Sequence, residues 1–467
     1  MASVAVIGGG ITGLTAAFVL KQRGLRVVLY EAGNRLGGTI MTERRDGYLA
    51  ELGPNSMTPP EPAAAQILHD LGLDQSTISA SSAAAHRYIV RRGKPVRVPG
   101  SPAELLTSRL LSNTAKLAVF GEPLVETADS PMDESVAAFV RRRFNQEIVD
   151  YLANPFVAGT FAGDPEQLSI RHALPHLQAL ERTHGSVIKA YVKGMRARRG
   201  VAEVASASPK LLSFQNGIGE IPEALERELQ GVVRLGSPVT QIRGGGKGWT
   251  VGAAFQPAEM YESVIYAAPA HALGEIDLDL AGGDRLSTLS SIVYPPVAVL
   301  ALGFRREQIA HPLDGLGFLV PEVERRRILG VIFSSSLFGG RAPDGHVLLT
   351  AFLGGSRDPD FVNTDPQTLT ARVMDELRML LGVQGDPTFR AHQVWPKAIP
   401  QYTLGYGRFK DIIEHTEQAN PGLVLAGTYR DGIALGDAIA SGTRGADRVA
   451  AHLGQQRVAQ GVSSEPH

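Results

Sequence analysis

Glycines spaced for close approach to an anion follow a short apolar run near the start of the chain. The run is Val4-Ala5-Val6-Ile7, and the glycines belong to Gly8-Gly9-Gly10-Ile11-Thr12-Gly13. In this pattern the first glycine allows a tight turn, the middle one lets the backbone approach a pyrophosphate, and the last lets the next helix pack closely on a sheet. The start of that helix offers unpaired N–H groups and a positive dipole end, which favour an anion. The motif therefore predicts a strand, a turn and a helix that bind a dinucleotide.

A carboxylate and an arginine extend the same binding motif. Glu31 follows Gly13 by 18 residues, close to the spacing of about 20 at which a carboxylate accepts hydrogen bonds from ribose hydroxyls. Its negative charge disfavours a 2′-phosphate, so NADP is not expected here. The arginine of Arg35-Leu36-Gly37-Gly38 can reach a pyrophosphate, although an isolated arginine is more often a solvated surface charge. These residues and the later segment Gly53-Pro54-Asn55-Ser56 favour FAD over NAD.

The composition excludes several kinds of chemistry. The 467 residues carry a formal net charge of −1, which gives no reason to expect nucleic-acid binding, and they include no cysteine. Disulfides, thiolate catalysis, cysteine-ligated metals and cysteinyl attachment of a flavin are therefore excluded, and we expect FAD to bind non-covalently. The 12 histidines are scattered without metal-ligand spacing, and no His/Asp or paired-carboxylate cluster predicts acid–base catalysis. We expect the flavin to do the chemistry.

The chain shows no signal for export. It begins directly with a strand pattern, and it has no apolar run long enough for a transmembrane helix. At this length two or three domains are expected rather than a single core. We therefore expect a bacterial protein that is cytoplasmic or lies at the inner face of the cell membrane.

The apolar patterning predicts the elements that must position these residues. A helix is expected over roughly 10–23, and residues 98–200 are expected to be mostly helical. Within that region a helix begins at Asp133-Glu134-Ser135, and Pro155 is expected to end it. Further predicted elements are strands at 87–90, 262–269, 297–302, 347–352 and 422–427, a helix over 222–229, and a final helix after Gly432.

A polar segment without periodicity, Val201 to Pro209, is expected to be a loop. A basic cluster precedes it, formed by Lys193, Arg196, Arg198 and Arg199. A solvated loop is the simpler interpretation of this cluster, and contact with anionic lipid head groups is the alternative.

Segments from all along the chain add a more specific signal. They are Gly53-Pro54-Asn55-Ser56, His86-Arg87-Tyr88-Ile89, Pro155-Phe156-Val157-Ala158-Gly159-Thr160 with Gly163-Asp164, Gly317-Phe318-Leu319-Val320-Pro321, Leu329-Gly330-Val331-Ile332-Phe333-Ser334-Ser335, Phe352-Leu353-Gly354-Gly355-Ser356, Trp395-Pro396 with Ile399-Pro400-Gln401-Tyr402, and Gly432-Ile433-Ala434-Leu435-Gly436. Together these segments resemble the protoporphyrinogen oxidase family of FAD-dependent, amine-oxidase-like flavoproteins. The likeness runs over nearly the whole chain, and its middle and C-terminal segments are the more specific ones.

The resemblance implies an enzyme of haem or chlorophyll synthesis that oxidises a tetrapyrrole. It would remove six electrons from protoporphyrinogen IX to give protoporphyrin IX by hydride transfer to FAD. Dioxygen would reoxidise the flavin and yield hydrogen peroxide. Such a large, flat substrate requires a mostly apolar site with few polar anchors. The flavin supplies the electron sink, and the protein supplies position.

By position, the resemblance also assigns cofactor contacts. They are Gly8 to Gly13, Glu31, Ala32, Thr39, Gly53, Pro54, Asn55, Ser56, Val239, Trp395, Ile433, Ala434 and Leu435, with the backbone of Val239 touching the adenine ring. Arg35 and Gly38 join this set as the phosphate-side element described above.

The resemblance assigns further residues to the substrate. Arg87 matches the arginine that pairs with a propionate, Leu319, Leu329 and Phe352 match positions that sandwich the macrocycle, and Asn55, Ala158 and Gly159 line the flavin-side wall. A guanidinium can form two hydrogen bonds to a carboxylate, but Arg87 alone is equally consistent with a solvated strand arginine. For the three apolar side chains, packing in a β-sheet core is the simpler interpretation from the residues alone.

The implied fold is α/β, with a Rossmann-like FAD-binding domain of the p-hydroxybenzoate-hydroxylase-like type. This discontinuous domain would comprise residues 1–85, 209–275 and 395–467. A mixed β-sheet substrate domain would comprise residues 86–97 and 276–394, and residues 98–208 would form an α-helical, membrane-facing domain.

The expected partners are the tetrapyrrole and dioxygen, with handover of the poorly soluble product to the next enzyme of haem synthesis. A monomer or homodimer is the expected assembly. Family members are peripheral membrane proteins, so apolar side chains of the helical domain are expected at a lipid surface. The candidates are Leu105, Leu106, Leu110, Leu111, Leu117 and Phe120. An internally packed helical core is the alternative.

Three other functions stay open at this point. Coproporphyrinogen III differs from protoporphyrinogen IX only in two propionates in place of two vinyls, and the segments Gly53–Ser56 and Ser334-Ser335-Ser336-Leu337-Phe338 favour the protoporphyrinogen-using members. A flavin amine oxidase usually has a lysine that holds a water near the flavin and often an aromatic cage. An aromatic content of 6% without a clear cage disfavours it. The third alternative is a non-enzymatic, FAD-bound porphyrin carrier.

Overall fold

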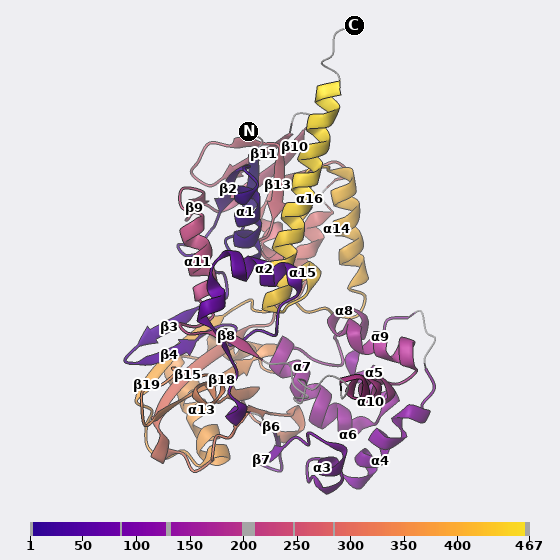
Figure 1. Cartoon of the computed structure of the whole chain (residues 1–467), viewed down its shortest axis with the longest axis vertical. Coiled ribbons are helices and arrows are strands. Elements are labelled where there is room, and N and C mark those ends of the chain that lie inside the picture. The colour runs from indigo at the N-terminus through magenta and orange to yellow at the C-terminus, as the bar shows by residue number, and fades with distance from the viewer. Residues whose placement is uncertain are drawn as a thin grey trace.

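The computed structural model describes residues 3–84, 86–127, 132–198, 211–245, 248–283 and 285–462. The predicted loop 201–209 lies outside these residues, as do the side chains of Arg196, Arg198 and Arg199. The elements gather around a parallel sheet, a large mixed sheet and a group of helices (Figure 1). In that view the parallel sheet lies above the other two parts.

A five-stranded parallel sheet collects strands from distant parts of the sequence. Its order is β20-β13-β1-β2-β9, and each neighbouring pair is parallel. The strands are β1 (Ser3–Ile7), β2 (Arg26–Tyr30), β9 (Val233–Arg234), β13 (Ser263–Tyr266) and β20 (Leu423–Leu425). The predicted α/β class with a Rossmann-like parallel sheet is therefore confirmed.

The first helix, α1 (Ile11–Gln22), confirms the predicted helix and is covered on both sides. Every residue from Ile11 to Leu20 is buried, because α1 lies between the sheet and the long C-terminal helix α16 (Leu435–Val462; Figure 1). A helix buried in this way is apolar around its whole circumference. Other helices of this part are α2 (Pro62–Asp70), α11 (Glu220–Glu228), α14 (Gly407–Ala419) and α15 (Thr428–Asp431).

A four-stranded sheet covers the other face of the parallel sheet. Alternate residues of β1 point to opposite faces: Val4 and Val6 pack with α1, whereas Ala5 and Ile7 pack in a cluster with Trp249. Trp249 belongs to a four-stranded sheet of order β12-β11-β10-β14. Its strands are β10 (Val239–Gly245), β11 (Gly248–Ala253), β12 (Glu259–Tyr261) and β14 (Asp277–Asp279), and two further pairs are β3 (Thr42–Arg45) with β4 (Tyr48–Glu51) and β5 (Thr77–Ser79) with β8 (Leu212–Phe214).

A seven-stranded mixed sheet forms the second large part, in the order β19-β15-β18-β17-β16-β6-β7. Its strands are β6 (His86–Arg91), β7 (Lys94–Arg97), β15 (Val297–Arg305), β16 (Gly315–Leu319), β17 (Gly330–Ile332), β18 (His346–Gly354) and β19 (Phe389–Trp395). Helix α13 (Pro366–Leu381) covers one face, where Leu300, Leu349 and Val373 share a core. The short helix α12 (Ser334–Leu337) lies next to β18.

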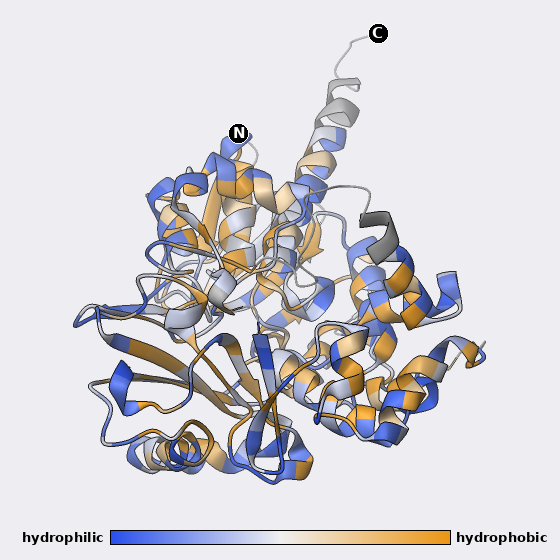
Figure 2. Ribbon diagram, turned by 60° about the horizontal axis from the view of Figure 1, so that its bottom comes forward, coloured by the Kyte–Doolittle hydropathy of each residue, from blue (hydrophilic) through white to orange (hydrophobic). Residues whose placement is uncertain are grey.

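Helices make up the third part. They are α3 (Pro102–Thr107), α4 (Asn113–Gly121), α5 (Val136–Arg143), α6 (Gln146–Ile148), α7 (Asn154–Phe161), α8 (Ile170–Ala173), α9 (Pro175–His184) and α10 (Val187–Arg198). Hydrophobic and hydrophilic residues alternate around these helices (Figure 2). Arg143 is fully buried among them and pairs with the carboxylates of Glu122 and Glu181. Such a buried pair is costly to break, so it holds several helices in one arrangement.

Pro155 does not end a helix, so that prediction was wrong. A π-helical turn, Val149–Ala153, precedes it, and α7 then runs from Asn154 to Phe161 through the proline. Pro155 lies in the first turn of α7. The helical stretch is continuous through this point, because Ala153 and Asn154 both have helical φ and ψ. Pro155 directly follows the π-helical turn, where the regular hydrogen-bond ladder is already interrupted, so the helix accommodates a residue that cannot donate.

The predicted lipid-facing set divides into buried, half-buried and exposed residues, and Leu105 is half-buried against the helical core. Leu110 and Leu111 are 0% and 4% exposed and belong to the helical core, so their placement on a surface was wrong. Leu106, Leu117 and Phe120 are 62%, 72% and 47% exposed. Within the described residues, no helix is long and apolar enough to cross a membrane.

Candidate functional site

The glycine motif forms an open cradle at the start of α1. A Cβ on Gly13 would lie 1.9 Å from the carbonyl oxygen of Gly8, so only glycine permits this contact. By contrast, no atom lies within 4 Å of a Cβ built on Gly10. Gly10 is the N-cap of α1, and no side chain caps the helix there. The open space and the uncapped N–H groups fit a dinucleotide pyrophosphate.

Glu31 is held at the end of β2, next to this cradle. Its two carboxylate oxygens accept hydrogen bonds from the N–H groups of Gly9 (2.6 Å) and Gly33 (2.7 Å). Each oxygen keeps a further lone pair for a ribose hydroxyl. The Ser237 N–H donates to the backbone carbonyl of Glu31 (2.8 Å), which brings the start of β10, and so Val239, beside the same site. Contact of Val239 with adenine stays a prediction.

The loop that contains Arg35 closes against the cradle. The Gly37 N–H donates to the carbonyl of Gly9 (2.9 Å), and Gly38 lies next to Gly10. The guanidinium of Arg35 donates to the carbonyls of Leu36 and Ile40 (both 3.1 Å) and of Gly38. Arg35 therefore braces its own loop, and its contact with pyrophosphate stays a prediction.

Trp395 links this loop to the segment that follows β4. Its indole Nε1 donates to the carbonyl of Leu52 (2.7 Å), and the guanidinium of Arg35 lies 5.6 Å from its ring centre. A Cβ on Gly53 would lie 1.9 Å from the carbonyl oxygen of Thr39. Gly53 and Thr39, which are both predicted to contact the cofactor, therefore lie next to each other. The Asn55 side-chain amide donates to the Gly53 carbonyl (3.0 Å), which orders the Gly53–Ser56 turn.

The last predicted cofactor segment enters from the C-terminal part of the chain. The Gly432 N–H donates to the hydroxyl of Tyr402 (2.9 Å), and that hydroxyl donates to the carbonyl of Thr428. Tyr402 therefore holds the turn before Ile433, Ala434 and Leu435. Burial raises the pKa of Tyr402 far above its usual value, so it stays a neutral donor. Its position in the Ile399–Tyr402 segment was a sequence signal, but its role was not predicted.

The pairing register of the mixed sheet aligns predicted substrate residues on one face. Val299 pairs with Phe352, Phe352 with Gly330, and Gly330 with Leu319. Residues paired across strands point to the same face. Leu319 and Phe352 therefore share a face, and it is opposite to the core under α13.

The same face extends to both sides of the sheet. Leu319 pairs with Ile89, and Arg87 lies two residues before Ile89, so strand alternation places Arg87 on this face as well. At the other side Trp395 pairs with Val297. A row from Arg87 through apolar side chains to Trp395 thus crosses the sheet. The sequence could not show this row because it depends on strand order.

Helix α7 covers this face. A Cβ on Gly159 would lie 2.5 Å from a methyl carbon of Leu319, so a larger residue here would displace the Leu319 side chain. Ala158 and Leu329 are buried in one small apolar cluster, and Phe352 and Trp395 pack against it. The structure thus brings the predicted wall residues of the substrate site together.

Arg87 is the exposed cation of this row. Among the residues that the structure describes, its guanidinium has no hydrogen-bond or ion-pair partner. Arg91, on the same strand, is instead paired with Glu147 (2.7 Å) and lies over the ring of Tyr151. Arg87 is therefore free to bind an external carboxylate.

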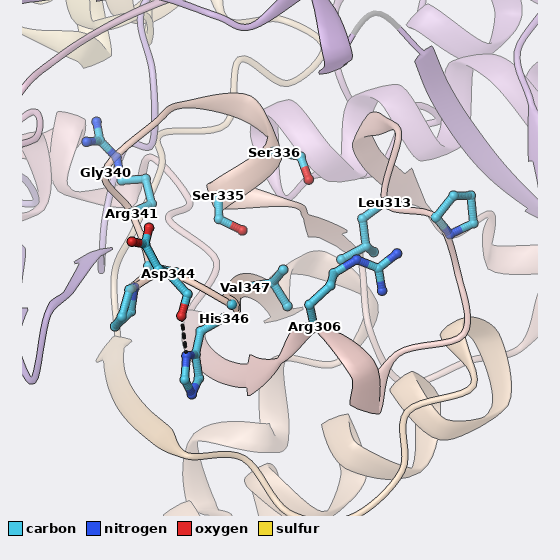
Figure 3. A pocket seen from close by; sticks show the side chains of 13 residues that line it. Arg306, Leu313, Ser335, Ser336, Gly340, Arg341, Asp344, His346 and Val347 are labelled. Atoms are coloured by element: carbon cyan, nitrogen blue, oxygen red, sulfur yellow. Dashed lines mark hydrogen bonds between the residues drawn. The ribbon is translucent and has the colours of Figure 1, made fainter.

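A polar cavity elsewhere in the molecule gives less support for a ligand site than the sheet face does. It has a volume of about 330 Å³ and is lined by residues that include Arg306, Arg341, Asp344 and His346 (Figure 3). His346 begins β18 six residues before Phe352, which places the cavity roughly 20 Å from the face described above. The Arg306 guanidinium donates to the carbonyls of Ile309 and His311. The hydrogen bond drawn in Figure 3 joins the ring of His346 to the backbone carbonyl of Asp344. No group of side chains suited to a metal ion occurs in the described part of the chain.

Comparison with known proteins places the chain in a family. The model of a family described as flavin containing amine oxidoreductase matches residues 11–450. The chain belongs to this family. FAD is accordingly the cofactor of this flavoprotein, as predicted, and the cradle described above has the shape and donors that such a group requires.

The flavoprotein is similar to porphyrinogen oxidases over its full length. It is 36% identical to protoporphyrinogen oxidase 2, chloroplastic/mitochondrial, of Arabidopsis thaliana, over 96% of this chain and 94% of that protein. It is 29% identical to coproporphyrinogen III oxidase of Staphylococcus aureus, over 97% of this chain and 99% of that protein. The family resemblance seen in the sequence is confirmed.

Solved structures share the fold. A crystal structure from an Exiguobacterium species superposes with a TM-score of 0.81 at 24% identity, covering 97% of this chain and 99% of that one. Cyclohexylamine oxidase from Brevibacterium oxydans superposes with a TM-score of 0.70 at 17% identity, covering 97% and 99%. At these identities the likeness concerns the fold alone.

Proposed function

We propose that this flavoprotein oxidises protoporphyrinogen IX to protoporphyrin IX in haem biosynthesis. Six electrons leave the substrate, dioxygen is the final acceptor, and hydrogen peroxide is released. The observation that carries the proposal is the row across the seven-stranded sheet, with the free cation Arg87 at one side and an apolar surface beyond it. A flat tetrapyrrole with carboxylates on one edge has the matching chemistry. The full-length similarity to protoporphyrinogen oxidases supports it.

The protein's own contribution is position. Leu319, Leu329 and Phe352 hold the macrocycle by apolar contact, and Ala158 and Gly159 close the opposite wall and exclude water. Arg87 donates two hydrogen bonds to a propionate and so sets the orientation of the ring. When bound, FAD supplies the hydride acceptor and the reaction with dioxygen. No acid–base residue is required, because the pyrrole N–H groups lose protons to water as conjugation spreads.

The cofactor contacts of the proposal are those expected from the sequence. The residues around the cradle, Gly8 to Gly13 with Glu31 and Ala32, bind the pyrophosphate and ribose. Thr39, Gly53 to Ser56, Trp395 and Ile433 to Leu435 lie along the flavin, and Val239 lies at the adenine. Arg35 and Gly38 complete the phosphate side.

The domain division is part of the same proposal. Residues 1–85, 209–275 and 395–467 form an FAD-binding domain of the p-hydroxybenzoate-hydroxylase-like type, 86–97 and 276–394 the substrate domain, and 98–208 the helical domain. The helical domain faces a lipid surface at the inner side of the cell membrane, through Leu106, Leu117 and Phe120. A flotation assay tests this: the holoprotein should rise with vesicles of anionic lipid, and the triple change to serine should leave it in the dense fraction. Flotation that is equal for both proteins would contradict the lipid-facing surface.

Coproporphyrinogen III is the second candidate substrate. It is supported by similarity to coproporphyrinogen III oxidases of Staphylococcus aureus at 29% and of Bacillus subtilis at 27% identity. The two substrates differ in whether two positions carry propionates or vinyls, so the polarity of the pocket rim decides between them. An amine oxidase and a non-catalytic porphyrin carrier are the remaining alternatives.

One experiment separates these functions. The holoprotein is mixed anaerobically with protoporphyrinogen IX and, separately, with coproporphyrinogen III, while the flavin absorbance is recorded. Fast bleaching with the first and slow bleaching with the second is expected. The reverse order would identify a coproporphyrinogen oxidase. Bleaching by neither would contradict the proposal and leave the amine oxidase or, if porphyrin still binds, the carrier.

A further inference from the structure

A buried arginine outside the predicted site connects the elements that form its walls. Arg357 belongs to the short turn Gly355–Arg357, which directly follows β18. Its terminal nitrogens donate to the backbone carbonyl of Val320 and to the side-chain carbonyl of Asn154, both at 2.6 Å. Val320 follows the last residue of β16, and Asn154 is the first residue of α7. One guanidinium thus joins α7 to the ends of two strands.

Asn154 extends the connection to Glu322 through both the oxygen and the nitrogen of its side-chain amide. Its carbonyl oxygen also accepts from the N–H of Glu322 (3.0 Å), and its NH₂ group donates to the Glu322 carboxylate (3.1 Å). Asn154 is 8% exposed, whereas Glu322 is exposed, so the network runs from the interior to the surface. A side-chain network of this kind restrains the positions of its members, because moving one of them breaks bonds to the others.

The other end of α7 is tied to the same turn. The N–H of Ser356, the residue before Arg357, donates to the carbonyl of Ala162 (2.8 Å), and Ala162 follows the last residue of α7. The turn after β18 therefore holds both ends of a helix that is eight residues long. Helix α7 cannot shift along or away from the sheet without losing one of these bonds.

Helix α7 and the sheet are in direct contact at Gly159. Gly159 packs against Leu319 so closely that a Cβ would come within 2.5 Å of it. Leu319 is the residue before Val320, which accepts from Arg357. A shift of the helix would therefore change the contact between the two surfaces that the proposed macrocycle touches.

Burial of this arginine carries a cost that packing alone does not explain. Burial lowers the pKa of Arg357 to about 10, although Glu322 and Asp164 lie near enough to oppose the shift. At neutral pH the group is still a cation. Its Nε has no hydrogen-bond partner within the described residues. An apolar residue would avoid these penalties, so a role in the site is the simpler reason for an arginine.

We propose that Arg357 and Asn154 are positioning residues, which hold the α7 wall of the tetrapyrrole site at a set distance from the sheet face of Leu319 and Phe352. The inference rests on the proposed function, because it concerns the same site. Neither residue touches the reacting atoms. Their effect is on how well the pocket is preorganised for a flat ligand.

The test is binding of protoporphyrin IX, the proposed product, to holoprotein, followed by its absorbance and fluorescence. Arg357→Met keeps the apolar stem and removes both donors. We expect its dissociation constant for protoporphyrin IX, and its KM for the porphyrinogen, to rise about tenfold, with a smaller change in kcat. Arg357→Lys keeps the charge and can reach one of the two acceptors, so it should recover part of the loss.

Arg326→Met is the matched control. Arg326 is also largely buried, pairs with Glu376 on α13 (2.7 Å), and likewise has an Nε without a partner in the described structure. Helix α13 lies on the opposite face of the sheet from α7. This variant should lose thermal stability comparable with that of Arg357→Met and keep the porphyrin dissociation constant of the wild type.

Equal porphyrin binding by Arg357→Met and the wild type would overturn the inference, as would an equal loss in Arg326→Met. Failure of the proposed function has a different signature. In that case the wild-type holoprotein itself would neither oxidise a porphyrinogen nor bind protoporphyrin IX, and the positioning role would fall with it. Binding without oxidation would contradict only the proposed activity.

Discussion

Arg87 carries the polar part of the proposed substrate contact. It is exposed, has no partner among the described side chains, and stands on the same sheet face as Leu319. A remote anchor contributes similar binding energy to the substrate and to the transition state. We therefore expect Arg87→Ala to raise KM for protoporphyrinogen IX about tenfold and to change kcat less, as measured by steady-state kinetics.

Arg97→Ala provides the control for Arg87. Arg97 lies on the neighbouring strand β7, where it pairs with Tyr88, so its side chain points to the opposite face. It is about half exposed and lies 3.8 Å from Glu104. Its loss should leave KM unchanged. An equal KM for Arg87→Ala and the wild type would remove Arg87 from the anchoring role.

A substitution at Gly10 should weaken cofactor binding without disturbing the fold. Its backbone, with φ −71° and ψ 174°, is extended and open to any residue, and no protein atom would meet a new side chain's Cβ within 4 Å. Gly10→Val should therefore fold normally, as judged by circular dichroism. Filling the cradle should weaken FAD binding at least about tenfold, as measured by titration of the apoprotein. Full flavin occupancy in the variant would contradict the cradle.

At the scale of elements, Glu51 at the end of β4 joins the parallel sheet's loops to the mixed sheet. It is 4% exposed and accepts from the hydroxyl of Thr42 (2.6 Å) and the N–H of Ile218 (2.8 Å). Burial outweighs these bonds and the attraction of Arg341, and it raises the pKa of Glu51 to about 7. The folded protein therefore favours the protonated carboxyl.

The pH dependence of stability follows from this raised pKa. The stabilising contribution is complete below the unfolded pKa of 4.5 and is lost as pH rises through about 7, which amounts to roughly 3 kcal/mol. We expect the free energy of unfolding in urea to fall over this range in the wild type and much less in Glu51→Gln. Glu223→Gln, at an exposed partner of Arg44, is the control and should keep the wild-type slope. Equal slopes in wild type and Glu51→Gln would contradict the assignment.

At the scale of the whole molecule, the cofactor is expected to link distant parts of the chain. The parallel sheet alone draws strands from residues 3–30, 233–266 and 423–425, and the proposed FAD contacts add residues 53–56 and Trp395, which ends β19 of the mixed sheet. Ligand that binds only the folded state stabilises it, by about 2.7 kcal/mol at a free concentration one hundred times the dissociation constant. Removal of FAD should therefore lower Tm, and added FAD should restore it in proportion to its concentration. A Tm independent of FAD would contradict this linkage.

Local chemistry was predictable from the sequence. The cradle, α1 and Glu31 lie within about thirty residues of one another, and the glycines are required by contacts between near neighbours in the chain. The membership of the family and the cofactor were also accessible, because their motifs are short and contiguous. Pro155 is an exception to the local rule that proline ends a helix, because it follows a π-helical turn through which the helix continues.

Only the tertiary structure decided which side chains face the site. Leu106 and Leu110 are similar in sequence context, yet one is 62% exposed and the other is buried. Arg87 and Trp395 share a sheet face because of strand order and register, which no local pattern encodes. Arg357 meets Asn154 across 203 residues. Such contacts depend on how distant segments pack, because each segment alone is compatible with many partners. The sequence by itself therefore determined the cradle, whereas only the tertiary structure determined which residues line the walls of the site.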